Sequence, residues 1–237
     1  MKDEIIYRQI KQEEFDNCLK LIAKFKKNSE LNKKFVEWDY SLNPFGKSKI
    51  FVAEYRGEFI GIMICNPLKF QNDKKVYNGF RLQDMLTNVS FLRKEIREGR
   101  KIPRKEGVGI IPNLLKVTNN YLDKNSEFSI GFPNDKSLPF FENKWVGLSK
   151  DPWILHEAPL IEKYLDQNNS NLKFEYNLIK QFDDVHENAW KDNISNKIDI
   201  MWTKKHSNWR YILNPRSNYK TFEIKQNTKV VGYIVLK

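Results

Sequence analysis

The pattern of apolar and polar positions mixes strand-like and helix-like segments from the beginning of the chain. Positions 5–10 (IIYRQI) alternate weakly, which predicts a short strand. Apolar residues then recur near helical spacing across 11–28, which predicts an amphipathic helix. A second helix is predicted over 31–42. It should end at Asn43, because a residue that precedes a proline avoids the α-helical region.

The next apolar runs have the composition of strands. Runs at 50–54 and 58–65 flank the turn glycine of YRGE and predict a hairpin, and 79–91 is a third strand candidate. The charged segment 92–101 is predicted to be helical. A periodic apolar run at 110–122 predicts a helix, and a strand ending at Pro133 and a short helix at 138–148 follow. A hairpin before a β–α–β unit predicts an α/β fold with a mixed, mostly antiparallel sheet flanked by helices.

A second, smaller unit is predicted after position 171. Positions 151–171 are less regular and contain NNSN, which is typical of a linker. Beyond them come a strand at 172–182, a helix at 183–193 and two strand-like runs at 220–225 and 229–236. We therefore expect one domain over 1–150, a linker over 151–171 and a partial second α/β lobe over 172–237.

One short motif occurs twice. WDYSLNP (38–44) and WRYILNP (209–215) share five residues at an offset of 171, and the same offset also pairs identical residues at 49/220, 51/222 and 61/232. Chance would give only about two identities in such a window, so we interpret the match as an internal repeat of a helix, an Asn-Pro stop and a hairpin. The second copy ends after its hairpin. The chain is then either a shortened form of a two-lobed protein, or its last unit only packs on the first.

Charge and cysteine content narrow the classes of partner. The formal net charge is +11, from 41 basic and 30 acidic residues, which favours an anionic partner such as nucleic acid, a membrane surface or a phosphorylated small molecule. The densest basic run, 93–105, is either a solvated helix face or a phosphate-facing patch. The sequence contains no run of about 18 apolar residues, so it predicts no membrane-spanning helix. Two cysteines and a charged N-terminus without a signal peptide favour the cytoplasm.

The most informative chemical motif is RKEGVG at 104–109. Glycines let backbone N–H groups approach a ligand, and the N-terminus of the helix that follows adds positive potential, so the stretch suits phosphate or pyrophosphate. It is neither a P-loop nor a dinucleotide fingerprint. Alone it is equally compatible with an ordinary turn at the start of a helix. The three histidines lack metal-ligand spacing, and no nucleophile elbow is present.

RKEGVG resembles the Arg/Gln-x-x-Gly-x-Gly/Ala loop of the GNAT (GCN5-related N-acetyltransferase) superfamily. The stretches at 35–65 and 131–148 are similar to the front and the end of a tandem GNAT subgroup, so the resemblance covers about 5–149. It implies the acyl-CoA N-acyltransferase fold, a degenerate second lobe, acetyl-CoA as co-substrate and no metal.

Carried over residue by residue, the resemblance implies a set of contacts to acetyl-CoA. The pyrophosphate would meet the loop and the first turn of the helix, and the pantetheine arm would lie along the preceding strand. The residues implied are Arg104, Gly107, Val108, Gly109 and Ile110 at the pyrophosphate, Leu86, Thr87 and Val89 on the strand, and Asn134 at the pantetheine or the acceptor.

Asp84 is the candidate general base, and its alternative role is a solvated or salt-bridged strand residue. The tyrosine that acts as the acid in many GNAT enzymes has no counterpart after Asn134, so either water serves or the lobe is inactive. The basic insert between Asn88 and Pro103 also departs from the family; it would form a lid or displace the loop.

Three functions follow from this reading. The first is an N-acyltransferase that moves an acetyl or acyl group from coenzyme A to a primary amine of a small molecule or an amino sugar. The second is a tRNA-dependent aminoacyl or peptidyl transferase of the cell-wall type, which the basic charge would suit. The third is a catalytically inactive acyl-CoA-binding module, which the missing tyrosine favours.

Overall fold

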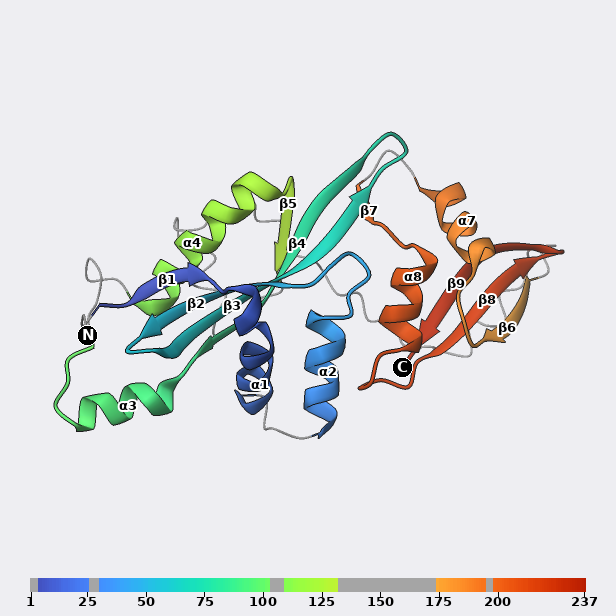
Figure 1. Cartoon of the computed structure of the whole chain (residues 1–237). Helices are drawn as coiled ribbons and strands as arrows, with labels where there is room; N and C mark the ends of the chain where they lie inside the picture. The colour runs from blue at the N-terminus through green and yellow to red at the C-terminus, as the bar shows by residue number, and fades with distance from the viewer. Residues whose placement is uncertain (1–3, 26–29, 103–108, 132–173, 195–197) are drawn as a thin grey trace, which may run out of the picture.

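A computed structural model describes residues 4–25, 30–102, 109–131, 174–194 and 198–237 (Figure 1). The predicted linker, the helix at 138–148 and the site residues Arg104, Gly107, Val108 and Asn134 lie outside these ranges. Within them, no helix is long and apolar enough to cross a membrane.

The first unit is a mixed sheet in the order β1-β2-β3-β4-β5, with β7 added at the far end of β3. All strand pairs are antiparallel except β4 with β5, which run parallel and are joined through α4. This confirms the predicted mixed, mostly antiparallel α/β fold. The strands are β1 (Ile6–Gln9), β2 (Lys49–Tyr55), β3 (Glu58–Gln71), β4 (Val76–Thr87), β5 (Phe128–Gly131) and β7 (Asp199–Ile200).

Helices cover both faces of this sheet, because successive strand residues point to opposite sides. Ile50 and Ile64 face one way and form a core with Ile22 and Val36 of the first two helices. Phe51, next to Ile50, faces the other way, into a core with residues of α4. The helices of the unit are η1 (Gln12–Glu14), α1 (Phe15–Phe25), α2 (Glu30–Tyr40), α3 (Val89–Arg97) and α4 (Ile110–Asn125).

Several boundaries differ from the predictions. The third strand was expected to reach position 91, but β4 ends at Thr87 and α3 begins at Val89. Asn88 accounts for the switch, because its side chain accepts a hydrogen bond from the N–H of Phe91 (3.2 Å) and so caps the helix. Val89 therefore lies on a helix, and its placement on the strand was wrong. Strand β3 is longer than predicted and extends to Gln71.

The second unit is a three-stranded antiparallel sheet in the order β6-β8-β9, with short helices beside it. Its strands β6, β8 and β9 are paired in the same antiparallel order as β1, β2 and β3, and its described residues form no equivalent of β4 or α4. Its elements are β6 (Phe174–Ile179), α7 (Asp184–Asn193), α8 (Lys204–Ser207), the π-helical turn η3 (Asn208–Ile212), β8 (Lys220–Gln226) and β9 (Lys229–Leu236).

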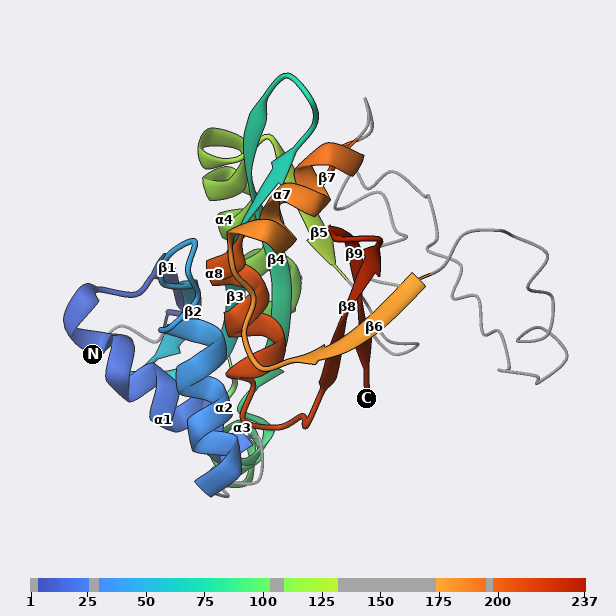
Figure 2. The same ribbon diagram turned by 90° about the vertical axis from the view of Figure 1, so that its right-hand side faces the viewer.

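The two units meet where the repeated tryptophans stack, with α2 beside α8 (Figures 1 and 2). The rings of Trp38 and Trp209 lie 4.5 Å apart and 16° from parallel. The indole N–H of Trp38 donates to the carbonyl of Trp209 at 2.9 Å, and that of Trp209 donates to the carbonyl of Trp38 at 3.0 Å. The two tryptophans, which the sequence pairs at an offset of 171, thus make the same contact in both directions, as across a two-fold axis.

Two further contacts between the units are related by the same offset of 171. Phe45 stacks on His206 at 4.9 Å, and at the positions offset by 171 the guanidinium of Arg216 lies 3.7 Å from the ring centre of Phe35. A groove of about 620 Å³ beside the stack is lined by five pairs at this offset. They are Lys34 and Lys205, Glu37 and Asn208, Trp38 and Trp209, Leu42 and Leu213, and Pro44 and Pro215.

Candidate functional site

The N-terminus of α4 lies against the end of β4. Gly61 of β3 pairs with Thr87, and a Cβ atom built on Gly61 would come within 2.7 Å of the Cγ2 of Ile110. Only glycine therefore lets the first turn of α4 approach the sheet this closely. Gly109 precedes the helix in an extended conformation, and no described side chain caps it. An uncapped helix N-terminus offers free amides and positive potential to an anion.

The last part of β4 is open on one side among the described residues. β5 pairs with β4 only from Gly79 to Leu82, whereas β3 continues to pair with it as far as Thr87. Within the open part, Asp84 and the residue after it stand opposite a single residue of β3, so β4 carries a bulge there. Asp84 occupies a left-handed conformation with φ of 50°. A bulge of this kind redirects side chains and ends regular pairing, which leaves room for a ligand beside the strand.

The structure brings together part of the predicted acetyl-CoA site. Thr87, Gly109 and Ile110 meet around Gly61 at the end of β4. Leu86 instead packs on the core beneath α1 and α2, so its side chain serves the core. Val89 is exposed on the first turn of α3.

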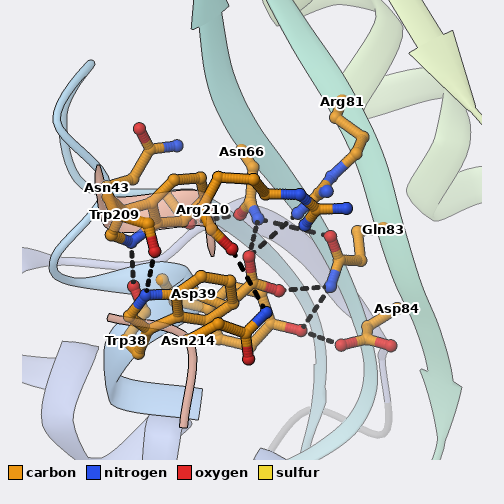
Figure 3. Close-up of polar contacts among 12 residues, drawn as sticks. Trp38, Asp39, Asn43, Asn66, Arg81, Gln83, Asp84, Trp209, Arg210 and Asn214 are labelled. Carbon is orange, nitrogen blue, oxygen red and sulfur yellow. Dashed lines mark hydrogen bonds and ion pairs between the residues drawn. The ribbon is translucent and has the colours of Figure 1, made fainter. Parts of the chain in front are cut away.

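Asp84 is held by hydrogen bonds. The hydroxyl of Tyr40, at the end of α2, donates to the Oδ2 of Asp84 (Figure 3). The side-chain amide of Gln83 in turn lies 3.3 Å from the Tyr40 hydroxyl oxygen and donates to the Oδ2 of Asp39 at 2.5 Å. The candidate base is therefore linked to a polar cluster between α2 and the sheet.

That cluster was not predicted from the sequence. Asp39 is 1% exposed and accepts from Arg81 at 2.9 Å, from Asn66 at 3.1 Å and from Gln83. Asn66 is equally buried and accepts from the hydroxyl of Ser48. The available sequence signal was the alternation of Arg81 and Gln83 on a strand, which places two polar side chains on one face.

Burial lowers the pKa of Arg81, Asp39 raises it, and the positive charge of Arg210 in the second unit lowers it further. Arg210 directly follows Trp209, so the stack between the units brings its charge close to Arg81 (Figure 3).

Neither cysteine is a candidate nucleophile. Cys18 and Cys65 are fully buried, and burial raises the pKa of each thiol to about 12. Such thiols stay protonated near neutral pH, whereas a nucleophile needs the thiolate. The described residues contain no group of three or more histidine, cysteine or carboxylate side chains arranged to hold a metal ion.

No protein-family model matches the sequence, and no curated protein matches it. A solved structure from Enterococcus faecalis, a conserved protein of unknown function called a "Probable N-Acyltransferase", aligns with 99% of this chain at a TM-score of 0.63 and 10% identity. The alignment spans both units. The chain has the GNAT fold. It covers 55% of the length of that protein.

Other solved GNAT-fold structures align with the chain over less of its length. A predicted acetyltransferase of Clostridium acetobutylicum, solved with acetyl-CoA, aligns with 65% of this chain and 96% of its own, at 14% identity and a TM-score of 0.42. An aminoglycoside acetyltransferase from an uncultured soil metagenomic sample aligns with 66% of this chain and 96% of its own, at 15% identity and a TM-score of 0.42.

Proposed function

We propose that the protein is an N-acyltransferase that moves an acetyl or acyl group from coenzyme A to the primary amine of a small molecule. The observation that carries this proposal is the glycine-preceded N-terminus of α4, which no described side chain caps, beside the part of β4 that only β3 pairs with among the described strands, in a chain with the GNAT fold. A ligand there can meet free amides at the helix end and a strand edge beside it.

The residues around this end of β4 have distinct roles in the proposal. The amides of Gly107, Val108, Gly109 and Ile110 receive the pyrophosphate, with Arg104 at the entry of the loop. Thr87 and the backbone at Leu86 flank the pantetheine arm, and Val89 borders it from α3. The role assigned to Asn134 is contact with the pantetheine or the acceptor.

The reaction requires the amine to lose a proton and its nitrogen to bond to the thioester carbon as the C–S bond breaks and the thiolate takes up a proton. In this scheme Asp84 accepts the amine proton. The position of Asp84 near the end of β4, beside the proposed donor site, and the hydrogen bond from Tyr40 to its carboxylate support this role. Water supplies the proton to the thiolate in this scheme.

The organisation of the chain belongs to the same proposal. The unit at 172–237 is a second, partial copy of the first, linked through 151–171, and the reciprocal tryptophan contacts support this. The donor site lies in the first unit, and the protein acts in the cytoplasm.

Calorimetric titration with acetyl-CoA tests the proposal. The wild type should bind one equivalent, and Gly109→Trp should weaken binding at least tenfold. Among the described residues, the nearest atom to a Cβ at 109 is 3.8 Å away, so the new side chain meets no described atom closely and occupies the space in front of the helix. Asn120→Trp, at an exposed position of the same helix, should bind like the wild type. A wild type that does not bind acetyl-CoA would refute the function, and undiminished binding by Gly109→Trp would refute the site.

A further inference from the structure

An unbalanced group of cations lies where the second unit meets the polar cluster of the first. Arg81 comes from β4, and Arg210 comes from η3. Asp39 is the carboxylate that pairs with Arg81, at 2.9 Å. The predicted repeat places Asp39 and Arg210 at equivalent positions, so the two units contribute opposite charges to the same junction.

Several polar groups at this junction have no partner among the described residues. The Nε of Arg81 is buried without a hydrogen-bond partner, and so is the Nδ1 of His206, a side chain that is 3% exposed. Within the part of the chain that the structure describes, the guanidinium of Arg210 makes no hydrogen bond or ion pair. Buried donors and charges are normally paired, because leaving them without a partner costs stability.

The charges at this junction are also unbalanced, with more positive than negative groups. Arg81 and Arg210 each lower the pKa of His206 and Arg210 lowers that of Arg81, so the three groups share one region of positive potential. A single carboxylate, already engaged by three donors, does not neutralise two guanidinium groups. Paired arginines with spare donors are the usual protein ligands of carboxylate and phosphate oxygens.

We propose that Arg81 and Arg210 together bind an anionic group, a carboxylate or a phosphate, carried by the acyl acceptor. The inference rests on the proposed acyl transfer and narrows its substrates to small amines that bear an acid. The line of contacts from Asp39 through Gln83 and Tyr40 to Asp84 joins this anion site to the candidate base. An acceptor anchored by its acid would therefore present its amine on the side of Asp84.

Calorimetry with inorganic phosphate tests the anion site directly. The wild type should bind phosphate, and Arg210→Gln should weaken that binding at least tenfold, whereas Arg210→Lys should retain part of it. Arg216→Gln is the matched control, because it removes an exposed arginine of the same unit that stacks on Phe35, and it should bind phosphate within twofold of the wild type. Equal affinities of wild type and Arg210→Gln, or no binding by the wild type, would overturn the site.

Three amines then distinguish the anion and separate this inference from the general function. Phosphoethanolamine carries a phosphate, β-alanine carries a carboxylate, and ethylamine carries no acidic group. One of the two acids should bind at least tenfold more tightly than ethylamine, and Arg210→Gln should abolish the difference. Equal binding of all three would contradict the proposal. Acetyl-CoA should bind Arg210→Gln as it binds the wild type, so loss of the donor site and loss of the anion site give different results.

Discussion

Burial and neighbouring arginines both oppose a positive charge on His206. The ring stacks on Phe45 at 4.9 Å and on Trp209 at 5.4 Å, and it lies tilted against Trp202 at 4.9 Å. Burial, followed by the charges of the two arginines, lowers its pKa from 6.5 to about 3. The ring is therefore neutral in the folded protein at pH 7. It packs as an aromatic ring, and its Nδ1 has no hydrogen-bond partner among the described residues.

We expect His206 to make the protein sensitive to acid. Its pKa is lower in the folded than in the unfolded state, so between pH 6.5 and about 3 the unfolded chain binds the proton first and stability falls as the pH falls. In His206→Phe, which copies the residue at the equivalent position 35, this loss should disappear. The free energy of unfolding of the wild type should then fall relative to the variant by about 1.4 kcal/mol per pH unit below pH 6.

Urea unfolding at pH 7.5, 7, 6 and 5 measures the difference. The two proteins should respond alike between pH 7.5 and 7, where the histidine is neutral in both states. Parallel loss of stability in both proteins between pH 6 and 5 would show that the histidine is accessible to protonation in the folded state.

At the scale of elements, the junction of β3 with α4 determines where the proposed donor site lies. Gly61 lies between Ile110 and Ala53, and a Cβ atom added to Gly61 would come within 3.3 Å of the Cβ of Ala53 as well as meeting Ile110. Neither neighbour is the flexible end of a long side chain. The start of the helix is thus positioned by backbone-close packing on the strand.

Gly61→Ala should therefore shift the start of α4 and lower the free energy of unfolding by about 1–3 kcal/mol, the range typical of overpacking. Binding of acetyl-CoA should weaken together with stability, because the amides at the helix end move. Urea denaturation and calorimetry measure the two effects. Gly131→Ala serves as the control, since its new methyl group would lie 3.7 Å from Leu82, an ordinary contact. Equal stability of the two variants would show that α4 is not packed this tightly.

At the scale of the whole molecule, the stacked tryptophans hold the two units together. Both rings are buried, and each indole N–H satisfies a carbonyl of the other unit. The second unit also leaves apolar side chains of β6 and β9 exposed. Positions 171 residues earlier in the chain include Tyr7 and Met63, which pack beneath α4. We therefore expect the contact between the two tryptophans to contribute substantially to the stability of the second unit.

A double-mutant cycle tests the junction. Trp38→Ala and Trp209→Ala should each cost about 3–5 kcal/mol of unfolding free energy, the range for large aromatic side chains in a core. The double variant should cost less than their sum by at least about 1 kcal/mol, because each single change already removes the stack. Leu213→Ala, 65% exposed in the adjoining groove, should change stability by less than about 0.5 kcal/mol. Additive effects of the two tryptophans would show that they do not interact.

The local sequence pattern predicted most of the helices and strands, because the spacing of apolar residues and the preferences of turn residues act within a few positions. Weak alternation of apolar positions indicated β1, and runs with strand composition indicated β2, β3 and the strands of the second unit. Glycine turns and Asn-Pro indicated where helices begin and end. The boundary at Asn88 was missed because a cap competes with a β-rich pattern, and the structure resolves that competition in favour of α3.

The sequence alone thus determined the class of fold, the glycine-preceded helix and the repeated motif, all of which depend on short-range pattern. Only the tertiary structure decided what the repeat does and what surrounds Asp84. Trp38 meets Trp209, and Arg210 reaches Arg81, across separations of more than a hundred residues. No periodicity specifies such pairs, because they arise when whole elements pack, and it is this packing that assembles the polar cluster at the junction.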